Sequence, residues 1–353
     1  MVKVVLQLAE KTVVVSKEEL SDTLFVLFKA AGVSAEDAQL CADVLIDAEL
    51  RGIGSHGARF MDSLLARLIG GGLNPAAAIT IIRDKPALLL LDANGGLGHP
   101  AMIKAIKLAM PKAARSGSCA VGIRNANHFG HAGYYAELAA KEGFICMVTT
   151  NSTPLMPVWG GLDLCLGTNP VAFGLPASGD PIVLDMATSA IARGKIFVSA
   201  RKGEPIQEGI ALDKDGNPTT DAAEAIEGII LPNGHKGSGL AFVFDILSGV
   251  LTGAQFGANI VKLQGNTTTS QDLGFFAFLI NVADFMEMDE YLSKMEEVAD
   301  FIHNSRKMPG VDTLYLPGER SAALRDKNSS TGLSVPEDLM ENLASWKKRL
   351  NLN

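Results

Sequence analysis

Four clusters of Asn, Ser, Thr, Asp, His or Gly each follow a short apolar run in this chain. The clusters occupy residues 124–135, 151–154, 167–170 and 185–189, and three of the apolar runs span 119–123, 144–150 and 182–184. Apolar runs of this length are typical of buried strands, and polar groups where such strands end usually form a site. Turn chemistry also explains each cluster taken singly. Together the four predict a sheet with one polar pocket at a shared edge.

The cluster at 124–135 is the richest of the four, because it holds His128 and His131 together with two asparagines and a tyrosine pair. A histidine can exchange a proton near neutral pH, since its unperturbed pKa is about 6.5. The alternative is a histidine that caps a turn or is hydrogen-bonded inside the core. We therefore treat this segment as the first candidate for a catalytic site.

Helices and strands are expected to alternate along the chain after a strand-like start in residues 1–15. Helices are expected to begin at Ser16 and Ser34 and to span 60–69, 101–115, 240–252, 289–306 and 334–350; further strands are expected at 79–82, 87–92 and 275–280. Helix 289–306 is amphipathic, and its apolar side is expected to lie inside. The pattern predicts an α/β fold.

Two glycine-rich segments are candidate ligand-binding turns. Residues 51–57 combine glycines with Arg51, Ser55 and His56, and residues 231–239 carry Lys236 just before an expected helix. Free amides at a helix start favour a phosphate, although glycines there also permit close helix packing. The glycines at 95–98 lack the G-x-G-x-x-G spacing of a Rossmann fold, and no Walker loop occurs. Any nucleotide is therefore expected to be held in another way.

The bulk composition excludes several classes of protein. The 353 residues carry a formal net charge of -8, which argues against a nucleic-acid partner. No run reaches the roughly 18 uncharged apolar residues that a membrane span requires. The four cysteines stand singly in apolar surroundings without zinc-ligand spacing, so they are expected to be buried free thiols in a reducing compartment. We expect a cytoplasmic protein with no metal site.

Six motifs in order resemble those of the type-2 malate/L-lactate dehydrogenases, also called the L-sulfolactate dehydrogenase-like group, which includes ureidoglycolate dehydrogenase, diketogulonate reductase and piperideine-2-carboxylate reductase. They lie at residues 51–57, 127–135, 167–170, 185–189, 235–240 and 317–319. The resemblance implies a non-Rossmann α/β fold. It places residues 1–75 with 285–353 in a helical domain and residues 76–284 in a mixed-sheet NAD(P)-binding domain. It also implies a homodimer.

The activity that this resemblance implies is reversible hydride transfer between NAD(H) or NADP(H) and a small 2-oxo or 2-hydroxy acid, most simply malate or lactate. NAD is slightly favoured over NADP, although the chain has no Rossmann acid to read the ribose. Two other functions stay open on this scaffold. One is an NAD(P)H-dependent reductase of a cyclic imino acid. The other is a structural protein that binds cofactor without turnover.

The resemblance also implies roles for individual side chains. His128 is expected to be the base for alcohol oxidation, and His56 its partner or substitute. Ser55 is expected to relay or orient the proton, and Asp185 to orient a ring or bind the cofactor. The expected substrate contacts are Thr168 and Arg59, with Arg51 in reserve. The expected cofactor contacts are Ser152, Met186, Ala187, Thr188, Lys236, Gly318, Glu319 and Arg320.

The chain departs from the family pattern at three places. Arg59 lies four residues after Ser55, whereas many relatives place an arginine five residues after it, where this chain has Phe60. His131 stands where relatives usually carry a small residue and adds a titratable group. Residues 231–235 are one glycine shorter than the common form, which is expected to reshape the cofactor phosphate pocket.

Overall fold

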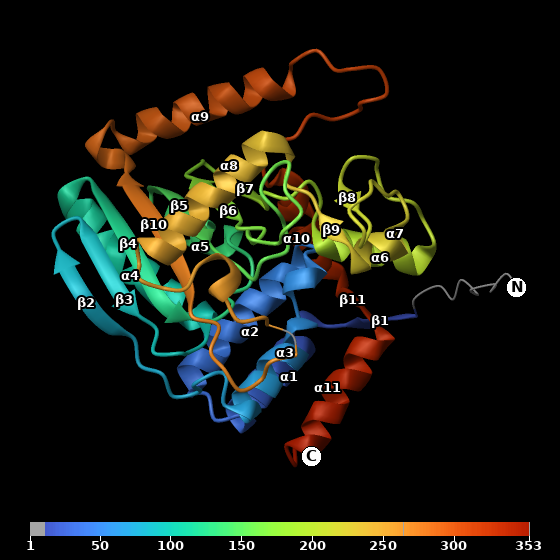
Figure 1. The fold of residues 1–353 in the computed structure, drawn as a ribbon. Coiled ribbons are helices and arrows are strands. Elements are labelled where there is room, and N and C mark those ends of the chain that lie inside the picture. The colour runs from blue at the N-terminus through green and yellow to red at the C-terminus, as the bar shows by residue number, and fades with distance from the viewer. Residues whose placement is uncertain (1–10, 264, 353) are drawn as a thin grey trace, which may run out of the picture.

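A seven-stranded sheet forms the centre of the computed structural model, which describes residues 11–263 and 265–352 (Figure 1). The strands, in their order across the sheet, are β2 (Thr80–Lys85), β3 (Leu88–Asp92), β4 (Ser118–Ala126), β10 (Leu273–Asn281), β5 (Phe144–Thr150), β6 (Val171–Leu175) and β7 (Ile182–Met186). Strands β3 and β4 pair in parallel, and the other neighbours pair antiparallel. The expected mixed sheet is therefore confirmed.

Helices α4 (Gly98–Ser116) and α5 (Gly133–Ala140) pack against this sheet. Side chains along β4 alternate between buried and partly exposed, and the apolar ones share a core with α4 and α5. Helix α4 begins at Gly98, where a Cβ would lie 2.0 Å from the carbonyl oxygen of Asn127. Its start is thus pressed against the segment that carries His128.

Segments from both chain ends share a second core. This core unites α1 (Lys17–Ala30), α2 (Ala35–Leu50), α3 (Phe60–Gly70), α11 (Glu337–Arg349) and the antiparallel pair of β1 (Thr12–Val15) with β11 (Leu333–Pro336). Ser16 and Ser34 cap α1 and α2 as expected. Residues 334–336 were expected to be helical, but their pairing with β1 makes them a strand. Residues 1–10 of the strand-like start lie outside the described residues, and the domain division stays a prediction.

A third, smaller core holds elements that the periodicity did not indicate. It contains α6 (Arg193–Lys202), β8 (Ala211–Leu212), α7 (Ala222–Glu227) and β9 (Ile229–Ile230). The next helix, α8 (Gly234–Asp245), continues as a π-helical turn, η2 (Ile246–Val250). Helix α8 thus begins before residue 240, and its glycines lie in the first turns. At Gly237 a Cβ would lie 2.5 Å from the carbonyl oxygen of Thr188, so this glycine permits close packing.

Helix α9 (Met288–His303) lies along one side of the molecule, far from α1, α3 and α11 (top of Figure 1). None of its residues is buried in the single chain, and Phe301 is 77% exposed. The expectation that its apolar side lies inside is therefore wrong for one copy of the protein. A loop follows, and then α10 (Glu319–Thr331), which the sequence did not indicate. The short 3-10 turns are η1 (Gly54–His56), η3 (Gly257–Asn259) and η4 (Val282–Asp284).

Two bulk expectations concern the cysteines and the membrane. Cys41, Cys119 and Cys146 are buried free thiols, whereas Cys165 is also free but only partly buried, which corrects the expectation for that residue. Among the described helices, none is both long and apolar enough to cross a bilayer.

Candidate active site

The four polar clusters lie at one edge of the central sheet. Strands β4 and β5 both pair antiparallel with β10, so they run in the same direction, and β7 shares that direction through β6. The segments after β4, β5 and β7 therefore leave the sheet at the same edge. Residues 167–170 lead into β6 instead of following a strand, but β6 runs the opposite way and begins at this edge. The shared edge is confirmed, and the expected strand exit at 167–170 is wrong.

Asn127 anchors the segment that carries His128. Its buried side-chain NH2 group donates to the carbonyl oxygen of Gly95 at 3.0 Å, and its side-chain oxygen accepts from the backbone N–H of Gln271 at 3.0 Å. The same oxygen accepts from the Arg67 guanidinium at 3.2 Å. Arg67 is fully buried and also donates to the carbonyl oxygen of Thr269. This network fixes the backbone on the N-terminal side of His128.

The His128 ring has a defined orientation. The Gly130 backbone N–H donates to Nδ1 of His128 at 3.1 Å. Because an amide can only donate, Nδ1 has to accept, and the neutral ring carries its proton on Nε2. Burial, followed by the charges of His56 and His99, lowers the pKa of His128 well below its usual range. His128 thus presents a neutral N–H donor, and its expected role as a base first requires release of the Gly130 contact.

His56 faces His128 from the helical side. The ring centroids of the two histidines lie 5.6 Å apart, and Ser55 Oγ lies 3.0 Å from His56 Nδ1. Burial and then the charge of His131 lower the pKa of His56 to about 4, while Asp185 opposes the shift. Ser55 is exposed and His56 partly exposed, so both reach the solvent side of the sheet edge. The Ser55 contact leaves Nε2 of His56 for another partner.

The two candidate arginines already hold carboxylates of this chain. Arg59 Nη2 lies 3.0 Å from Asp338, and the two side chains are 37% and 61% exposed. Arg51 lies 2.7 Å from Asp47 and 2.5 Å from Glu137, and its side chain is 7% exposed. A surface ion pair contributes little to stability, whereas removing one partner of a buried pair is costly. The exposed pair of Arg59 with Asp338 is therefore far cheaper to break than the buried pairs of Arg51.

His131 is a buried histidine between two carboxylates. Its Nε2 lies 3.1 Å from Asp47, and its Nδ1 lies 3.7 Å from Asp185. Burial lowers the pKa of His131, but Asp185 and Asp47 outweigh that effect and raise it to about 9. Burial likewise opposes ionisation of Asp47, but His131 and Arg51 lower its pKa to about 2. The three groups form a charged cluster in which His131 is buried, Asp47 is partly buried and Asp185 is the most exposed.

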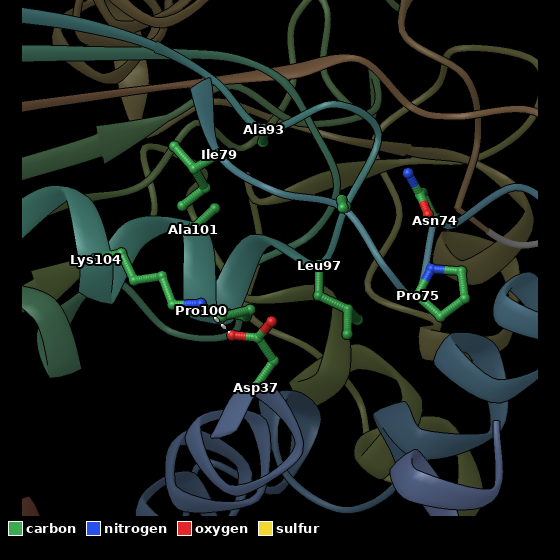
Figure 2. A pocket seen from close by; sticks show the side chains of 11 residues that line it. Asp37, Asn74, Pro75, Ile79, Ala93, Leu97, Pro100, Ala101 and Lys104 are labelled. Atoms are coloured by element: carbon green, nitrogen blue, oxygen red, sulfur yellow. Dashed lines mark hydrogen bonds and ion pairs between the residues drawn. The ribbon is translucent and has the colours of Figure 1, made fainter. Parts of the chain in front are cut away.

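A cavity of about 210 Å³ borders this cluster, and Arg51, His131, Asp185 and Gly318 are in its wall. A second cavity, of about 20 Å³, lies between α2 and the start of α4, where Lys104 and Asp37 point toward each other 2.5 Å apart (Figure 2). It is too small for a substrate. Among the described residues, no group of three or more His, Cys, Asp or Glu side chains is placed to hold a metal ion.

Three residues that were predicted to contact the substrate or the cofactor lie around the start of α8: Thr168, Thr188 and Lys236. The Thr188 amide and hydroxyl donate to the Thr168 carbonyl oxygen at 2.9 and 2.8 Å, and the Thr188 carbonyl oxygen accepts from the Asn233 amide at 2.9 Å. No side chain caps α8, and Lys236 is exposed in its first turn. Ser152, after β5, has a buried hydroxyl without a hydrogen-bond partner in the described part of the chain.

The other predicted cofactor residues lie at the end of β7 or in the segment that hydrogen-bonds to this strand and opens α10. They are Met186, Ala187, Gly318, Glu319 and Arg320. Gly318 has a φ of 88°, and a Cβ there would lie 2.7 Å from the carbonyl oxygen of Val183. Glu319 Oε1 lies 2.9 Å from Nε2 of His303. Its carboxylate is therefore engaged by α9 in this structure.

Two residues at the site escaped the sequence analysis. Phe60 stacks against both histidines, with its ring centroid 4.1 Å from that of His128 and 5.9 Å from that of His56. Its place after Arg59 was noticed, but nothing in the sequence indicated stacking. His99 is fully buried, and both of its ring nitrogens lack a hydrogen-bond partner among the described residues. Its position beside the glycines at 95–98 was the available signal.

Comparison with known proteins identifies the family and the fold of this chain. The malate/L-lactate dehydrogenase family profile matches residues 15–344. L-sulfolactate dehydrogenase from Methanocaldococcus jannaschii is 40% identical over 93% of this chain and 94% of its own length, and malate dehydrogenase from Pyrococcus abyssi is 36% identical over 97% and 96%. The structure of sulfolactate dehydrogenase from M. jannaschii superposes with a TM-score of 0.91, 38% identity, and coverage of 97% of this chain and 98% of that one. The expected non-Rossmann fold and family are thereby confirmed: the chain belongs to the malate/L-lactate dehydrogenase family of oxidoreductases.

Proposed function

We propose that this protein transfers a hydride between NAD(H) or NADP(H) and a small 2-hydroxy or 2-oxo acid, most simply malate or lactate. The observation that carries the proposal is the pairing of Ser55 with His56 opposite the ring of His128 at the polar sheet edge. Reduction of a ketone needs a hydrogen-bond donor that stabilises the developing alkoxide and a group that delivers a proton to it. The two histidines offer these two functions from opposite sides.

The residues around the start of α8 fit a nicotinamide cofactor. The uncapped helix start and Lys236 suit a phosphate, and the orphaned Ser152 hydroxyl is a polar group in need of a partner. We assign six further residues as contacts of the same cofactor: Met186, Ala187, Thr188, Gly318, Glu319 and Arg320. When bound, the cofactor supplies or accepts the hydride. We favour NAD slightly over NADP.

The chain's own residues divide the remaining work. His128, with its proton on Nε2, donates a hydrogen bond to the substrate oxygen. In alcohol oxidation the neutral His56, oriented by Ser55, accepts the hydroxyl proton, and in ketone reduction it first takes a proton from solvent and then gives it to the alkoxide. If the Gly130 contact opens, His128 takes the role of base itself. Arg59 leaves Asp338 and holds the substrate carboxylate, with Thr168 as a further contact. Asp185 acts on His131 rather than on the ring of His128, because its contacts lie there.

We further propose a homodimer in a reducing, cytoplasmic setting. Apolar side chains cluster on the outer face of α8 and η2, where Phe242 is 56% and Leu251 61% exposed. Together with the apolar side of α9, they form a surface suited to a second copy. The free thiols support the cytoplasmic setting.

The test is the absorbance of reduced nicotinamide when the protein is mixed with NADH or NADPH and oxaloacetate, pyruvate or a cyclic imino acid. We expect turnover with a 2-oxo acid. Turnover only with the imino acid would replace the proposal by an imine reductase. Cofactor binding without any turnover would indicate a structural protein instead.

A further inference from the structure

His131 joins the two main cores at the wall of the large cavity. Asp47 comes from α2 in the helical part, Asp185 ends β7 of the sheet, and His131 lies between β4 and α5. The imidazole is 6% exposed and lies 3.1 Å from one carboxylate and 3.7 Å from the other. His131 and the two carboxylates therefore link α2, the segment before α5 and the end of β7, which are distant in the sequence.

The Asp185 carboxylate is held on the His131 side. The Gly133 backbone amide donates to its Oδ2 at 2.7 Å, and a Cβ on Gly133 would lie 3.0 Å from the same oxygen. Within the described residues, the contacts of Asp185 are with Gly133 and His131, whereas Nδ1 of His56 meets Ser55. His56 therefore has a serine, and not this carboxylate, as its close partner.

The other charged groups around His131 come from several elements. They are Asp47 on α2 and Arg51 just after it, Glu137, Tyr134 and Lys141 at α5, Asp180 and Asp185 at β7, Arg325 and Asp326 on α10, and the nearby rings of His56 and His99. Among the charged residues that line the cavity, Arg51 and a charged His131 balance Glu137 and Asp185. A neutral His131 would leave the cavity wall one unit negative.

We propose that His131 is a positioning residue that, as a buried cation shared by Asp47 and Asp185, holds Asp185 against the start of α5 and away from His56. The consequence for turnover rests on the proposed function, but the charge arrangement does not. The directions of the pKa shifts agree: the two carboxylates raise the pKa of His131, and after burial the His131 charge is what lowers the pKa of His56. Removing the cation frees Asp185 to act on His56.

The test is an NMR pH titration of the full chain labelled at histidine Cε1. The chain has six histidines, so each signal can be assigned with a single His→Gln variant. In the wild type we expect His131 to be protonated and His56 neutral at pH 7. In Asp47→Asn the His131 midpoint should fall by about one unit or more, because one of its two carboxylates is lost. Asp43→Asn, one helical turn earlier, is the matched control and should leave it unchanged.

The decisive variant is His131→Gln, in which the His56 midpoint should rise by about one unit, while His131→Lys restores a cation and should reverse much of the rise. The kcat profile should move to higher pH in the same variant. A neutral His131 at pH 7 in the wild type, or an unchanged His56 midpoint in His131→Gln, would overturn the inference. If His131→Gln does not fold, the Asp47→Asn titration decides. If the His131 and His56 titrations give the expected midpoints but the protein turns over no 2-oxo acid, the proposed function is refuted and the inference about His131 stands.

Discussion

The ring of His128 lies almost flat on the ring of Phe60, with centroids 4.1 Å apart and planes 17° from parallel. Phe60 directly follows Arg59, and its ring forms an apolar platform against the imidazole. Together with the Gly130 amide, this platform holds the imidazole in one orientation. The ring then needs little reorganisation to meet a substrate oxygen.

Replacement of His128 is expected to impair turnover. His128→Ala should lower kcat by on the order of a hundredfold or more, as loss of a donor or acid–base group does. His128→Gln keeps a side-chain N–H and should retain more activity than His128→Ala if hydrogen-bond donation is the main role. Steady-state kinetics decide between these outcomes. Wild-type rates in His128→Ala would move the whole role to His56.

Lys236→Ala is expected to weaken cofactor binding by about tenfold, the usual effect of losing one charge-assisted contact. The dissociation constants of NADH and NADPH, measured by fluorescence titration, give the answer. Lys214→Ala in the turn after β8 removes an exposed lysine elsewhere and serves as the control. An unchanged constant in Lys236→Ala removes this residue from the phosphate site.

The histidines are expected to make stability depend on pH in two opposite directions. The pKa values of His56 and His99 are lowered to about 4 and about 3, so their contribution is present above pH 6.5 and is lost as the pH falls through those values. The pKa of His131 is raised to about 9, so its contribution is complete below pH 6.5 and is lost as the pH rises through 9. That alkaline loss is on the order of 3 kcal/mol.

Urea unfolding of the wild type and of His131→Gln across this range measures the alkaline effect. The variant should be less stable near neutral pH and should lose little more toward about pH 9.5. His235→Gln, at an exposed histidine, should follow the wild-type curve. Equal alkaline losses in the wild type and His131→Gln would show that His131 is not a cation in the folded protein.

A charge on the outer face of α8 is expected to separate the proposed dimer. Phe242→Glu places a carboxylate on a surface that we assign to the second copy, so the dissociation constant should rise by tenfold or more. Light scattering over a range of concentrations measures the mass. Leu88→Glu, at an exposed apolar residue of β3, is the control. A wild-type monomer at all concentrations would contradict the dimer.

The sequence predicted most elements of the sheet and of the helical core because their apolar patterns are strong. The caps at Ser16 and Ser34 and the runs that became β4 and β5 have such local signals. Residues 334–336 and helix α6 do not. The first depend on pairing with β1, and the second belongs to a small core built from short segments. Such long-range pairing leaves no periodic trace in a single sequence.

The site was predicted as a set of motifs, but its geometry was not. The spacing of Ser55, His56 and His128 along the chain carried the resemblance, and the fold brings these residues together. The tautomer of His128 depends on an amide two residues away, and the Arg59 partner comes from α11. The apolar side of α9 was identified in the sequence. In the single chain that side is not buried, and we propose that a second copy covers it.

Transfer of deuterium from a reduced cofactor that carries two deuterium atoms at C4 of the nicotinamide ring tests the central claim most directly. The protein is incubated with labelled NADH or NADPH and oxaloacetate, pyruvate or sulfopyruvate, and the product acid is analysed by mass spectrometry. We predict deuterium bound at C2 of the 2-hydroxy acid, and its loss in the His56→Ala, His128→Ala double variant. Bound cofactor that transfers no deuterium to any of these acids would contradict the account.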